Sequence, residues 1–356
     1  MNNIITLSGD PGSGKSTVRN ALKNKIEKDG KETRIYCVGD IFRKLADDNG
    51  MTVTEFNQML EEKNANVDKE LDDMVAKYGG KIEKENDQSK VYIIDSRLAW
   101  NGIPKSFKVR LTVTDKIAAE RIFNDKTRGK EDKYETLEDA MKATMERKES
   151  EKNRYIDLYG LDLQNLEQYD LVVDTSYANV EDIVEIIEKC MIAKNNQKPF
   201  AKYWKSPKQF MPIQHVTMTL EANGESGESL DEWKKKIKNE GIEIDKPIIA
   251  MQAGKTYFVR DGHHRNFGAA LAGKTLVPYD VKWKDEENYN GFTTRRFLEL
   301  VLGDREYDRD LYEYEEFLSK NGEHFCYMSV YPGIEKGKIF EGNEKKNDEH
   351  EGNEER

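Results

Sequence analysis

Short apolar segments alternate with longer amphipathic segments over the first 190 residues of the chain. The apolar segments are rich in β-branched and aromatic residues and are bounded by turn or capping residues, which predicts strands at 4–7, 34–38, 91–94, 109–113 and 171–173. Helical periodicity between them predicts helices at 17–27 and 136–155, and a capping box at 52–55 opens another. Strands alternating with helices predict an α/β domain with a parallel sheet, over residues 1–194.

The alternation stops after residue 194. Residues 195–212 hold three of the eight prolines and show neither period, so they are predicted to form a linker. Beyond them we expect strands at 215–220, 248–252, 256–260 and 277–283, with helices from Ser229 to Gly241 and over 265–272. Residues from about 291 to 333 are expected to close this domain with helices. The second domain, at 213–335, is therefore predicted to be a smaller α+β domain.

Composition supports two folded domains followed by a tail. Hydrophobic residues make up 37% of the 356 residues and charged residues 35%, and 17 Tyr, 13 Phe and 4 Trp provide material for cores. The final 16 residues hold seven acids and three bases, which is −4 of the net charge of −11, and 336–356 is predicted to be a disordered acidic tail. No apolar run of 18 residues and no signal-peptide pattern occurs, so a cytoplasmic location without a membrane is expected.

Cysteine spacing and charge exclude some classes of site. Cys37, Cys190 and Cys326 form no CxxC pair, so neither a disulfide framework nor a zinc site is predicted, and the three are expected to be small buried hydrophobes. The negative net charge argues against a protein that coats nucleic acid nonspecifically. In 200–284 the bases are not outnumbered by the acids, so DNA binding there is not excluded.

Residues 9–16 match the pattern GxxxxGK[ST] between a predicted strand and a predicted helix. Such a loop cradles a β-phosphate with backbone N–H groups, while Lys15 neutralises β- and γ-phosphate charge and Ser16 can ligate Mg²⁺. The predicted cofactors are therefore ATP and Mg²⁺. The predicted cofactor-binding residues are Gly9, Asp10, Pro11, Gly12, Ser13, Gly14, Lys15, Ser16 and Thr17.

Two further groups suit phosphoryl transfer. Asp95 ends a predicted strand, as a Mg²⁺-binding acid beside a P-loop does, and Arg97 follows two residues later. The alternative is that Asp95 only caps a helix. Arginines outside the sheet predict a lid that closes over phosphates and excludes water, although each could instead belong to a solvated helix face; they are Arg121, Arg128, Arg147 and Arg154.

Together with the P-loop, an ordered series of short motifs resembles the archaeal-type cytidylate kinases over roughly residues 1–190. The motifs are GDIFR at 39–43, NGMT at 49–52, EF at 55–56, VD at 67–68, LD at 71–72, SRLA at 96–99, RI at 121–122, RKESE at 147–151, RYIDLYGLD at 154–162 and YDLVVDTS at 169–176. The resemblance implies a P-loop nucleoside monophosphate kinase fold that moves the γ-phosphoryl of ATP to a pyrimidine monophosphate.

The resemblance also implies residue roles. Lys15 and Ser16 would handle the donor and Mg²⁺, and the strand-end position of Asp95 already makes it the second candidate metal-binding residue. Asp40, Arg43, Asp68 and Arg97 would face the acceptor, and Arg121, Arg147 and Arg154 would make lid and donor contacts. The candidate catalytic residues are Lys15, Asp40, Asp95, Arg97 and Arg147.

The chain departs from the family at four positions. Ala118 and Asp125 stand where further lid arginines would be expected, Ser96 stands for a glycine, and Asp174 stands for an asparagine. The fold and the donor are unaffected by these departures. Fewer lid arginines weaken the inference to an ordinary monophosphate acceptor.

A second constellation occupies 256–270, TYFVRDGHHRNFGAA. Polar residues after a glycine at a helix start suit an anion, which predicts a phosphate site at Asp261, Gly262, His263, His264 and Arg265. The alternative is that Asp261 caps the helix and the histidines pack in a turn. With PII at 247–249 and GKTLVP at 273–278, the string resembles the ParB/sulfiredoxin-like superfamily over about 213–285, and Glu221 would be the candidate base if the resemblance extends to the serine kinases among its members.

These observations favour an ATP-dependent kinase with a pyrimidine-containing acceptor. A hydroxymethylated pyrimidine in DNA, 5-hydroxymethyluracil as in phage DNA hypermodification, is the favoured acceptor, since the second domain would place DNA beside the site. A free pyrimidine monophosphate is the alternative. Two other hypotheses are a nucleotide-dependent, ParB-like DNA-binding module with a regulatory P-loop domain, and a small-molecule kinase in the second domain with the P-loop domain regenerating its donor.

Overall fold

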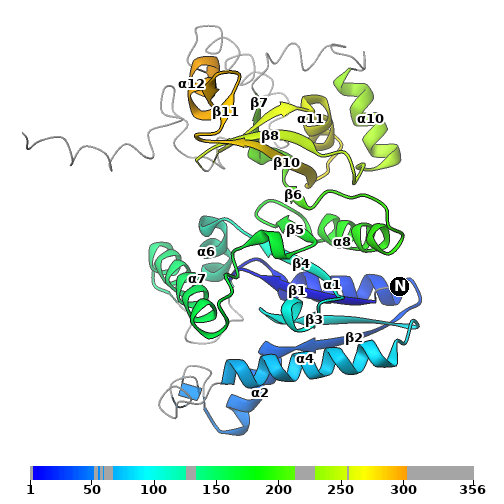
Figure 1. Cartoon of the computed structure of the whole chain (residues 1–356), viewed down its shortest axis with the longest axis vertical. Coiled ribbons are helices and arrows are strands. Elements are labelled where there is room, and N and C mark those ends of the chain that lie inside the picture. Colours follow the sequence, from blue (N-terminus) through cyan, green and yellow to red (C-terminus); the bar gives the residue numbers. More distant parts are fainter. Residues whose placement is uncertain are drawn as a thin grey trace, which may run out of the picture. The chain divides into compact units, whose positions relative to one another are not determined.

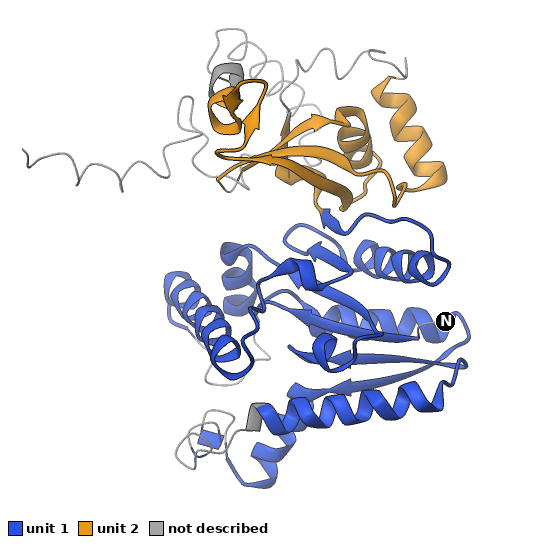
Figure 2. Cartoon of the chain, in the orientation of Figure 1, with its two compact units in different colours: residues 1–204 blue, residues 205–356 orange. Residues whose placement is uncertain are grey.

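A computed structural model describes residues 3–51, 55–56, 59, 67–125, 134–212, 229–254 and 256–302 (Figure 1). The chain divides into two compact units, residues 1–204 and residues 205–356 (Figure 2). Several sequence predictions lie outside the described residues: the strand at 215–220, Arg128, Glu221, Cys326 and the acidic tail. Within the described part of the chain, no helix is both long and apolar enough to cross a membrane.

The first unit alternates strands and helices along the chain, as predicted. Its elements are β1 (Ile4–Gly9), α1 (Lys15–Lys28), β2 (Glu32–Cys37), α2 (Val38–Asp48), α4 (Val67–Glu85), β3 (Lys90–Asp95), α5 (Ala99–Gly102), β4 (Phe107–Thr112), α6 (Asp115–Asn124), α7 (Leu137–Tyr159), η2 (Leu166–Gln168), β5 (Leu171–Asp174), α8 (Val180–Asn195) and β6 (Tyr203–Lys205).

The strands of this unit form a parallel sheet in the order β2-β3-β1-β4-β5-β6. β1 lies at the centre, with β3 on one side and β4 on the other. The chain runs from β1 to β2 on one side of the sheet and later crosses from β3 to β4 on the other side, and ligands of open α/β sheets bind at such a switch point, outside the carboxyl ends of the strands. The register pairs Leu7 with Asp95, so the P-loop and Asp95 emerge at the same sheet edge.

The central strands are buried on both faces. Ile5, Leu7, Ile93 and Ile94 are fully buried, and consecutive residues of a strand point to opposite faces. Helices must therefore cover both sides, which is why these strands read as continuous apolar runs rather than as alternating ones. The predicted α/β class of this unit is confirmed.

The second unit has fewer elements and a mixed sheet. They are η3 (Pro207–Gln209), β7 (Phe210–Pro212), α10 (Leu230–Glu240), β8 (Ile248–Ala253), β9 (Thr256–Asp261), α11 (His263–Leu271), β10 (Val277–Lys284), β11 (Asn288–Tyr289), β12 (Phe292–Thr293) and α12 (Thr294–Leu302). The strand order within the unit is β10-β8-β9-β7, with β8 and β9 antiparallel and the other two pairs parallel. A core that includes Phe210, Ile248, Val259 and Val277 joins this sheet to α10 and α11.

In the described part of the second unit, one local signal was predicted correctly and one segment was not. The predicted capping box is present, because the Ser229 hydroxyl accepts from the backbone N–H of Glu232 while the Glu232 carboxylate accepts from that of Ser229. The predicted linker 195–212 differs from expectation, since it contains β6, η3 and β7. Strands of three residues are too short to show a period in sequence, and neighbouring strands of the sheets hold them in place.

Candidate active site

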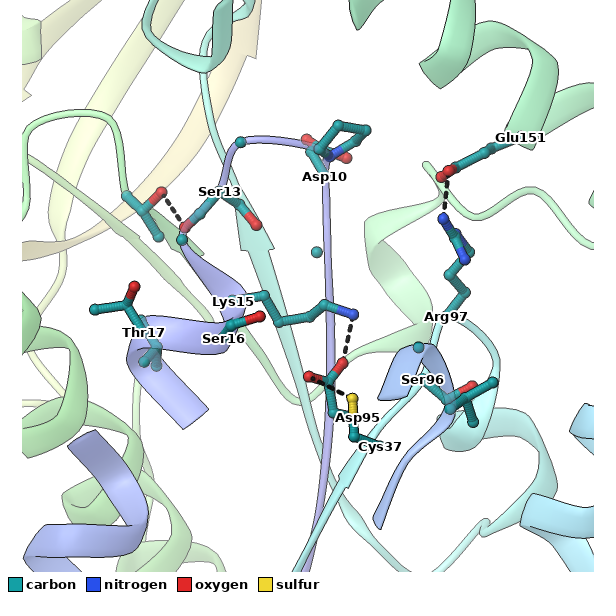
Figure 3. Close-up of a pocket in the computed structure, with 18 of the residues that line it drawn as sticks. Asp10, Ser13, Lys15, Ser16, Thr17, Cys37, Asp95, Ser96, Arg97 and Glu151 are labelled. Carbon is teal, nitrogen blue, oxygen red and sulfur yellow. Dashed lines mark hydrogen bonds and ion pairs between the residues drawn. The ribbon is translucent and has the colours of Figure 1, made fainter. Parts of the chain in front are cut away.

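A cavity of about 1320 Å³ opens at the carboxyl edge of the first unit's sheet. The P-loop, the end of β3 and the start of α2 line one part of it, and α6 and α7 contribute further side chains. Figure 3 shows Lys15, Asp95, Arg97 and Glu151 around this space. The cavity brings together nearly all of the site residues predicted for the first unit: the whole P-loop, Arg43, Asp95, Arg97, Arg121, Arg147 and Arg154.

The P-loop folds as its glycines predict. β1 ends at Gly9, α1 begins at Lys15, and Gly12 between them has a φ of 75°, a left-handed conformation that side chains disfavour. The backbone N–H of Ser13 donates to the carbonyl of Asp10 at 3.1 Å, which closes the turn. The loop therefore presents backbone N–H groups and the N-terminus of α1 to the cavity, the arrangement that binds phosphate.

Asp95 is the centre of a charged cluster. Its carboxylate forms an ion pair with Lys15, and its other oxygen accepts from Arg19 Nη1 at 3.1 Å. Arg19 also lies 3.3 Å from Asp40 Oδ2, so it links the strand-end acid to α2. The sequence interpretation missed Arg19. A signal was available, because Lys15 and Arg19 are four residues apart on a helix and so share a face.

Cys37 ends β2, and Asp40 lies in the first turn of α2, which follows directly. Burial opposes ionisation of Asp40, but hydrogen bonds from Cys37 and Arg43 and the charge of Arg19 hold the pKa of this carboxyl below its usual range. Asp40 is therefore a carboxylate at neutral pH. The Cys37 thiol donates to Asp95 Oδ2 at 3.6 Å, and burial, with the Asp95 charge next, raises its pKa to about 11. Cys37 and Cys190 are both buried, as predicted.

Glu151 on α7 holds two of the predicted arginines. Arg97 forms an ion pair with its Oε1, and Arg147 Nε lies 3.2 Å from the same atom. Burial opposes ionisation, but the charges of these two guanidiniums hold the Glu151 pKa at about 2. Glu151 stood in a motif of the sequence and was not predicted as a site residue. Its position four residues after Arg147 on one helix face was the signal.

Arg121 was predicted to belong to a lid, and its contacts are with the frame of the cavity. It donates to the carbonyl of Gly12 at 3.2 Å, to that of Thr175 at 2.6 Å and to that of Ser176 at 3.2 Å. Burial lowers its pKa, and the charge of Asp174 opposes this. Arg121 therefore joins the P-loop to the segment between β5 and α8.

Ala118 has a packing reason to be small. A Cβ added to Gly12 would lie 2.8 Å from the Ala118 Cα, and Ala118 itself is 2% exposed. A long side chain at this position of α6 would collide with the P-loop. The absence of an arginine at 118 is thus explained by close approach of loop and helix, which weakens it as a sign of an unusual acceptor.

The predicted metal-binding residues fit Mg²⁺ chemically. Ser16 and Asp95 line the same cavity, and Mg²⁺ in such sites is held by one or two oxygen ligands together with waters and substrate phosphates. No group of three or more His, Cys, Asp or Glu residues able to hold a metal occurs among the described residues. Asp68 lies in α4, and its side chain is outside the description.

The predicted phosphate site of the second unit has two residues committed to the fold. His263 is 3% exposed, and burial, with the charges of His264 and Arg260 next, lowers its pKa to about 3, so it is neutral. Arg265 donates to the carbonyls of Lys246 and Pro247 at 2.9 and 3.1 Å and lies 3.2 Å from Asp261. Gly262 precedes α11 as its N-cap residue, with a φ of 91°. The alternative of packed histidines thus describes His263.

Comparison with known proteins identifies the first unit. The family model described as "AAA domain" matches residues 5–152. The cytidylate kinase of Methanosphaera stadtmanae is 32% identical over 188 residues, covering 53% of this chain and 97% of that protein. The cytidylate kinase of Methanocaldococcus jannaschii is 33% identical over 195 residues, with the same coverage of 53% and 97%.

Among solved structures, shikimate kinase from Bacteroides thetaiotaomicron is 13% identical with a TM-score of 0.36, covering 53% of this chain and 98% of that one. A similarity at this level carries no inference about function. The near-complete coverage of the two relatives, together with a P-loop, a strand-end aspartate and an arginine-lined cavity on one sheet edge, is decisive. Through its first half the chain belongs to the cytidylate kinase family, and it is a P-loop kinase, a phosphotransferase.

Proposed function

We propose that the first unit transfers the γ-phosphoryl group of ATP to a pyrimidine nucleotide. The observation that carries the proposal is one cavity that joins a phosphate-binding loop with Lys15 to a separate group of arginines, among them Arg43 and Arg97. A hydrolase needs only the first of these features, whereas a kinase must also hold an acceptor. The cytidylate kinases it matches along 97% of their length support a pyrimidine acceptor.

On the donor side, the chain supplies charge and orientation. Backbone N–H groups of the P-loop bind the β-phosphate, and Lys15 turns from Asp95 to the phosphates when they enter. Arg19 stays with the Asp95 carboxylate, so that acid remains compensated after Lys15 leaves. Ser16 and Asp95 would hold Mg²⁺, which when bound shields the charge of the transferring group.

On the acceptor side, we assign different roles to Asp40 and to the arginines. Asp40, a carboxylate at neutral pH, can accept a hydrogen bond from an acceptor hydroxyl and so orient it. Asp40 is not itself a lining residue of the cavity, but its ion-pair partner Arg43 is. Arg97, Arg147 and Arg154 line the cavity and can share the negative charge that spreads over the phosphoryl oxygens during transfer. Glu151 fixes two of them in place, which lowers the cost of ordering long side chains.

A hydroxymethylated pyrimidine in DNA, such as 5-hydroxymethyluracil, is a second candidate acceptor. The observation in its favour is that the cytidylate kinases match only 53% of this chain, which leaves the second unit without a counterpart in them. In this reaction the hydroxymethyl oxygen forms a bond to the γ-phosphorus, the bond from that phosphorus to the β–γ bridging oxygen breaks, and the hydroxyl proton is released. A ParB/sulfiredoxin-like second unit that binds DNA would present the polymer to the kinase.

One experiment distinguishes the acceptors. Purified full-length protein would be incubated with ATP labelled in the γ-phosphate and, in parallel, with CMP, dCMP, UMP, serine and DNA that contains 5-hydroxymethyluracil. Label in free pyrimidine nucleotides supports the first candidate, and label in DNA supports the second. Label in serine alone would contradict both and favour a small-molecule kinase. Transfer to none of them would favour the nucleotide-dependent DNA-binding module.

The control for this assay is Lys15→Met, which removes the cation of the P-loop. Transfer that survives this substitution would place the reaction outside the P-loop cavity. Lys23→Met is the matched control, since Lys23 is a 41% exposed side chain on the same helix, α1, and forms a surface ion pair with Glu27 at 3.8 Å.

A further inference from the structure

A buried ion pair lies directly beneath the phosphate loop. Asp10, the second residue of the loop, accepts a hydrogen bond from Arg110 Nη2 on β4 through its Oδ1 atom. The side chains of Asp10 and Arg110 are only 7% and 6% exposed. The sequence predicted Asp10 as a cofactor-binding residue of the loop and Arg110 only as part of the strand at 109–113, and it did not predict the pair.

A carboxylate in the phosphate loop is unfavourable for binding the negatively charged phosphates of ATP. Asp10 lines the cavity that receives the polyphosphate, and like charges that share a site of low polarity repel each other strongly. The loop can retain its anion affinity only if the charge of Asp10 is cancelled by a fixed cation. Arg110 is such a cation, because a guanidinium stays protonated in proteins.

Arg110 is committed to this one task. Its guanidinium carbon lies 5.8 Å from the centre of the Tyr169 ring, which holds the group from the side. Its Nε is buried and makes no hydrogen bond within the described part of the chain, which is a costly state for a donor. A cation placed in the interior at this cost indicates that its contact with Asp10 is what the site requires.

Lys148 adds a connection to α7. Its Nζ lies 3.6 Å from Asp10 Oδ2 and 3.4 Å from Asp115 Oδ1 at the start of α6. Lys148 follows Arg147 in sequence and is 29% exposed, so its contact with Asp10 is weaker and more hydrated than that of Arg110.

We propose that Arg110 is a positioning residue for the donor: it neutralises Asp10 from beneath and fixes the first half of the P-loop in the shape that binds phosphate. Lys148 links the same carboxylate to α7. The proposal concerns donor binding alone, so it does not depend on which acceptor the enzyme uses.

The test measures the dissociation constant of ATP by calorimetry, with no acceptor present, for the full-length protein and its variants. Arg110→Met leaves the Asp10 charge uncompensated beside the phosphates and is expected to weaken ATP binding by about tenfold or more. Lys148→Met is expected to weaken it less, by about threefold, because Arg110 remains. Asp10→Asn combined with Arg110→Met removes both charges, and we expect it to recover most of the affinity lost in Arg110→Met.

The double variant separates positioning through charge from a purely structural role. If the pair only stabilised the fold, each variant would lower the melting temperature while folded protein bound ATP as the wild type does, and the proposal would be overturned. It would be overturned equally if the double variant bound ATP as weakly as Arg110→Met. Arg34→Met is the matched control, because Arg34 pairs with Glu32 on the exposed face of β2 with 59% of its side chain exposed.

If Arg110→Met does not fold, two other variants decide. The double variant contains no buried charge at this place, so its folding does not depend on a partner, and its ATP affinity should be within about threefold of the wild type. Arg110→Lys keeps the charge but loses the planar fork, and its affinity should lie between those of the wild type and the tenfold-weakened level. A loss of more than tenfold in the double variant would overturn the proposal.

Discussion

Lys15 and Asp95 form an ion pair across the P-loop cavity, and Arg19 occupies the other oxygen of the same carboxylate at 3.1 Å. The Lys15 side chain is 25% exposed and is held at the sheet edge by the Asp95 side chain, which is 3% exposed. Because Arg19 compensates Asp95, Lys15→Met should leave the fold intact. We expect this variant to lose phosphoryl transfer by about a hundredfold or more, measured as kcat with saturating acceptor.

The result would be read beside thermal unfolding. A melting temperature near that of the wild type, with transfer lost, identifies Lys15 as part of the chemistry. A much lower melting temperature would show instead that the Lys15–Asp95 pair stabilises the fold. Retained phosphoryl transfer would contradict the proposal that the reaction takes place at the P-loop.

The Cys37 thiol should report on the charge of Asp95. Burial, with Asp95 next, raises its pKa to about 11. Asp95→Asn removes the anion and leaves the Arg19 and Lys15 cations nearby, so the thiol pKa should fall below that of the wild type. The measurement is the rate of thiol alkylation against pH in a background where Cys190 and Cys326 are serine. An unchanged midpoint would mean that burial alone sets the reactivity of Cys37.

Glu151 predicts a loss of stability in acid. Its pKa is lowered from 4.5 to about 2 in the folded chain, so its contribution is complete above pH 4.5 and disappears as the pH falls toward 2. That contribution is on the order of 3 kcal/mol. Urea unfolding of the wild type and of Glu151→Gln at several pH values should show a difference in unfolding free energy that shrinks over this window. A difference independent of pH would contradict the ion-pair account.

His263 predicts acid sensitivity in a higher range. Its pKa is about 3 in the folded state and 6.5 ordinarily. Below pH 6.5 this imidazole therefore becomes protonated in the unfolded chain but stays neutral in the folded chain. Stability should fall as the pH falls from 6.5, by about 2 kcal/mol at pH 5. His263→Phe and His263→Gln, neither of which titrates, should both lose this dependence. If either kept it, another group would be responsible.

The sequence predicted the frame of the kinase unit well because its signals are local. The short β-branched runs around Ile93 and Val109 favour buried strands, and the glycine spacing at 9–14 is typical of a phosphate-binding loop. The residues that hold the site together were missed, since Arg110 and Glu151 show their purpose only when distant elements meet. In a chain with many charged residues, the sequence alone does not distinguish the few charged side chains that become buried from those that stay exposed.

In the second unit, too, local features could be predicted from the sequence but the burial of a polar side chain could not. The Ser229 box, the glycine at 262 and the strands on each side of the turn at 254 were readable because each depends on a few neighbouring residues. The orientation of His263 was not. A histidine at the start of a helix suits an anion in sequence, and only the packing against Phe267, with ring centres 6.3 Å apart, shows that it belongs to the core.

The close fit of Gly12 against Ala118 leaves no slack between the phosphate loop and helix α6. If nucleotide binding changes the conformation of the loop, α6 must therefore move with it. Phe123 lies near the C-terminal end of α6 with 40% of its surface exposed, between Arg121 and Asn124, which line the cavity. A fluorophore attached at that position would therefore report the binding of the phosphoryl donor in real time, without an acceptor.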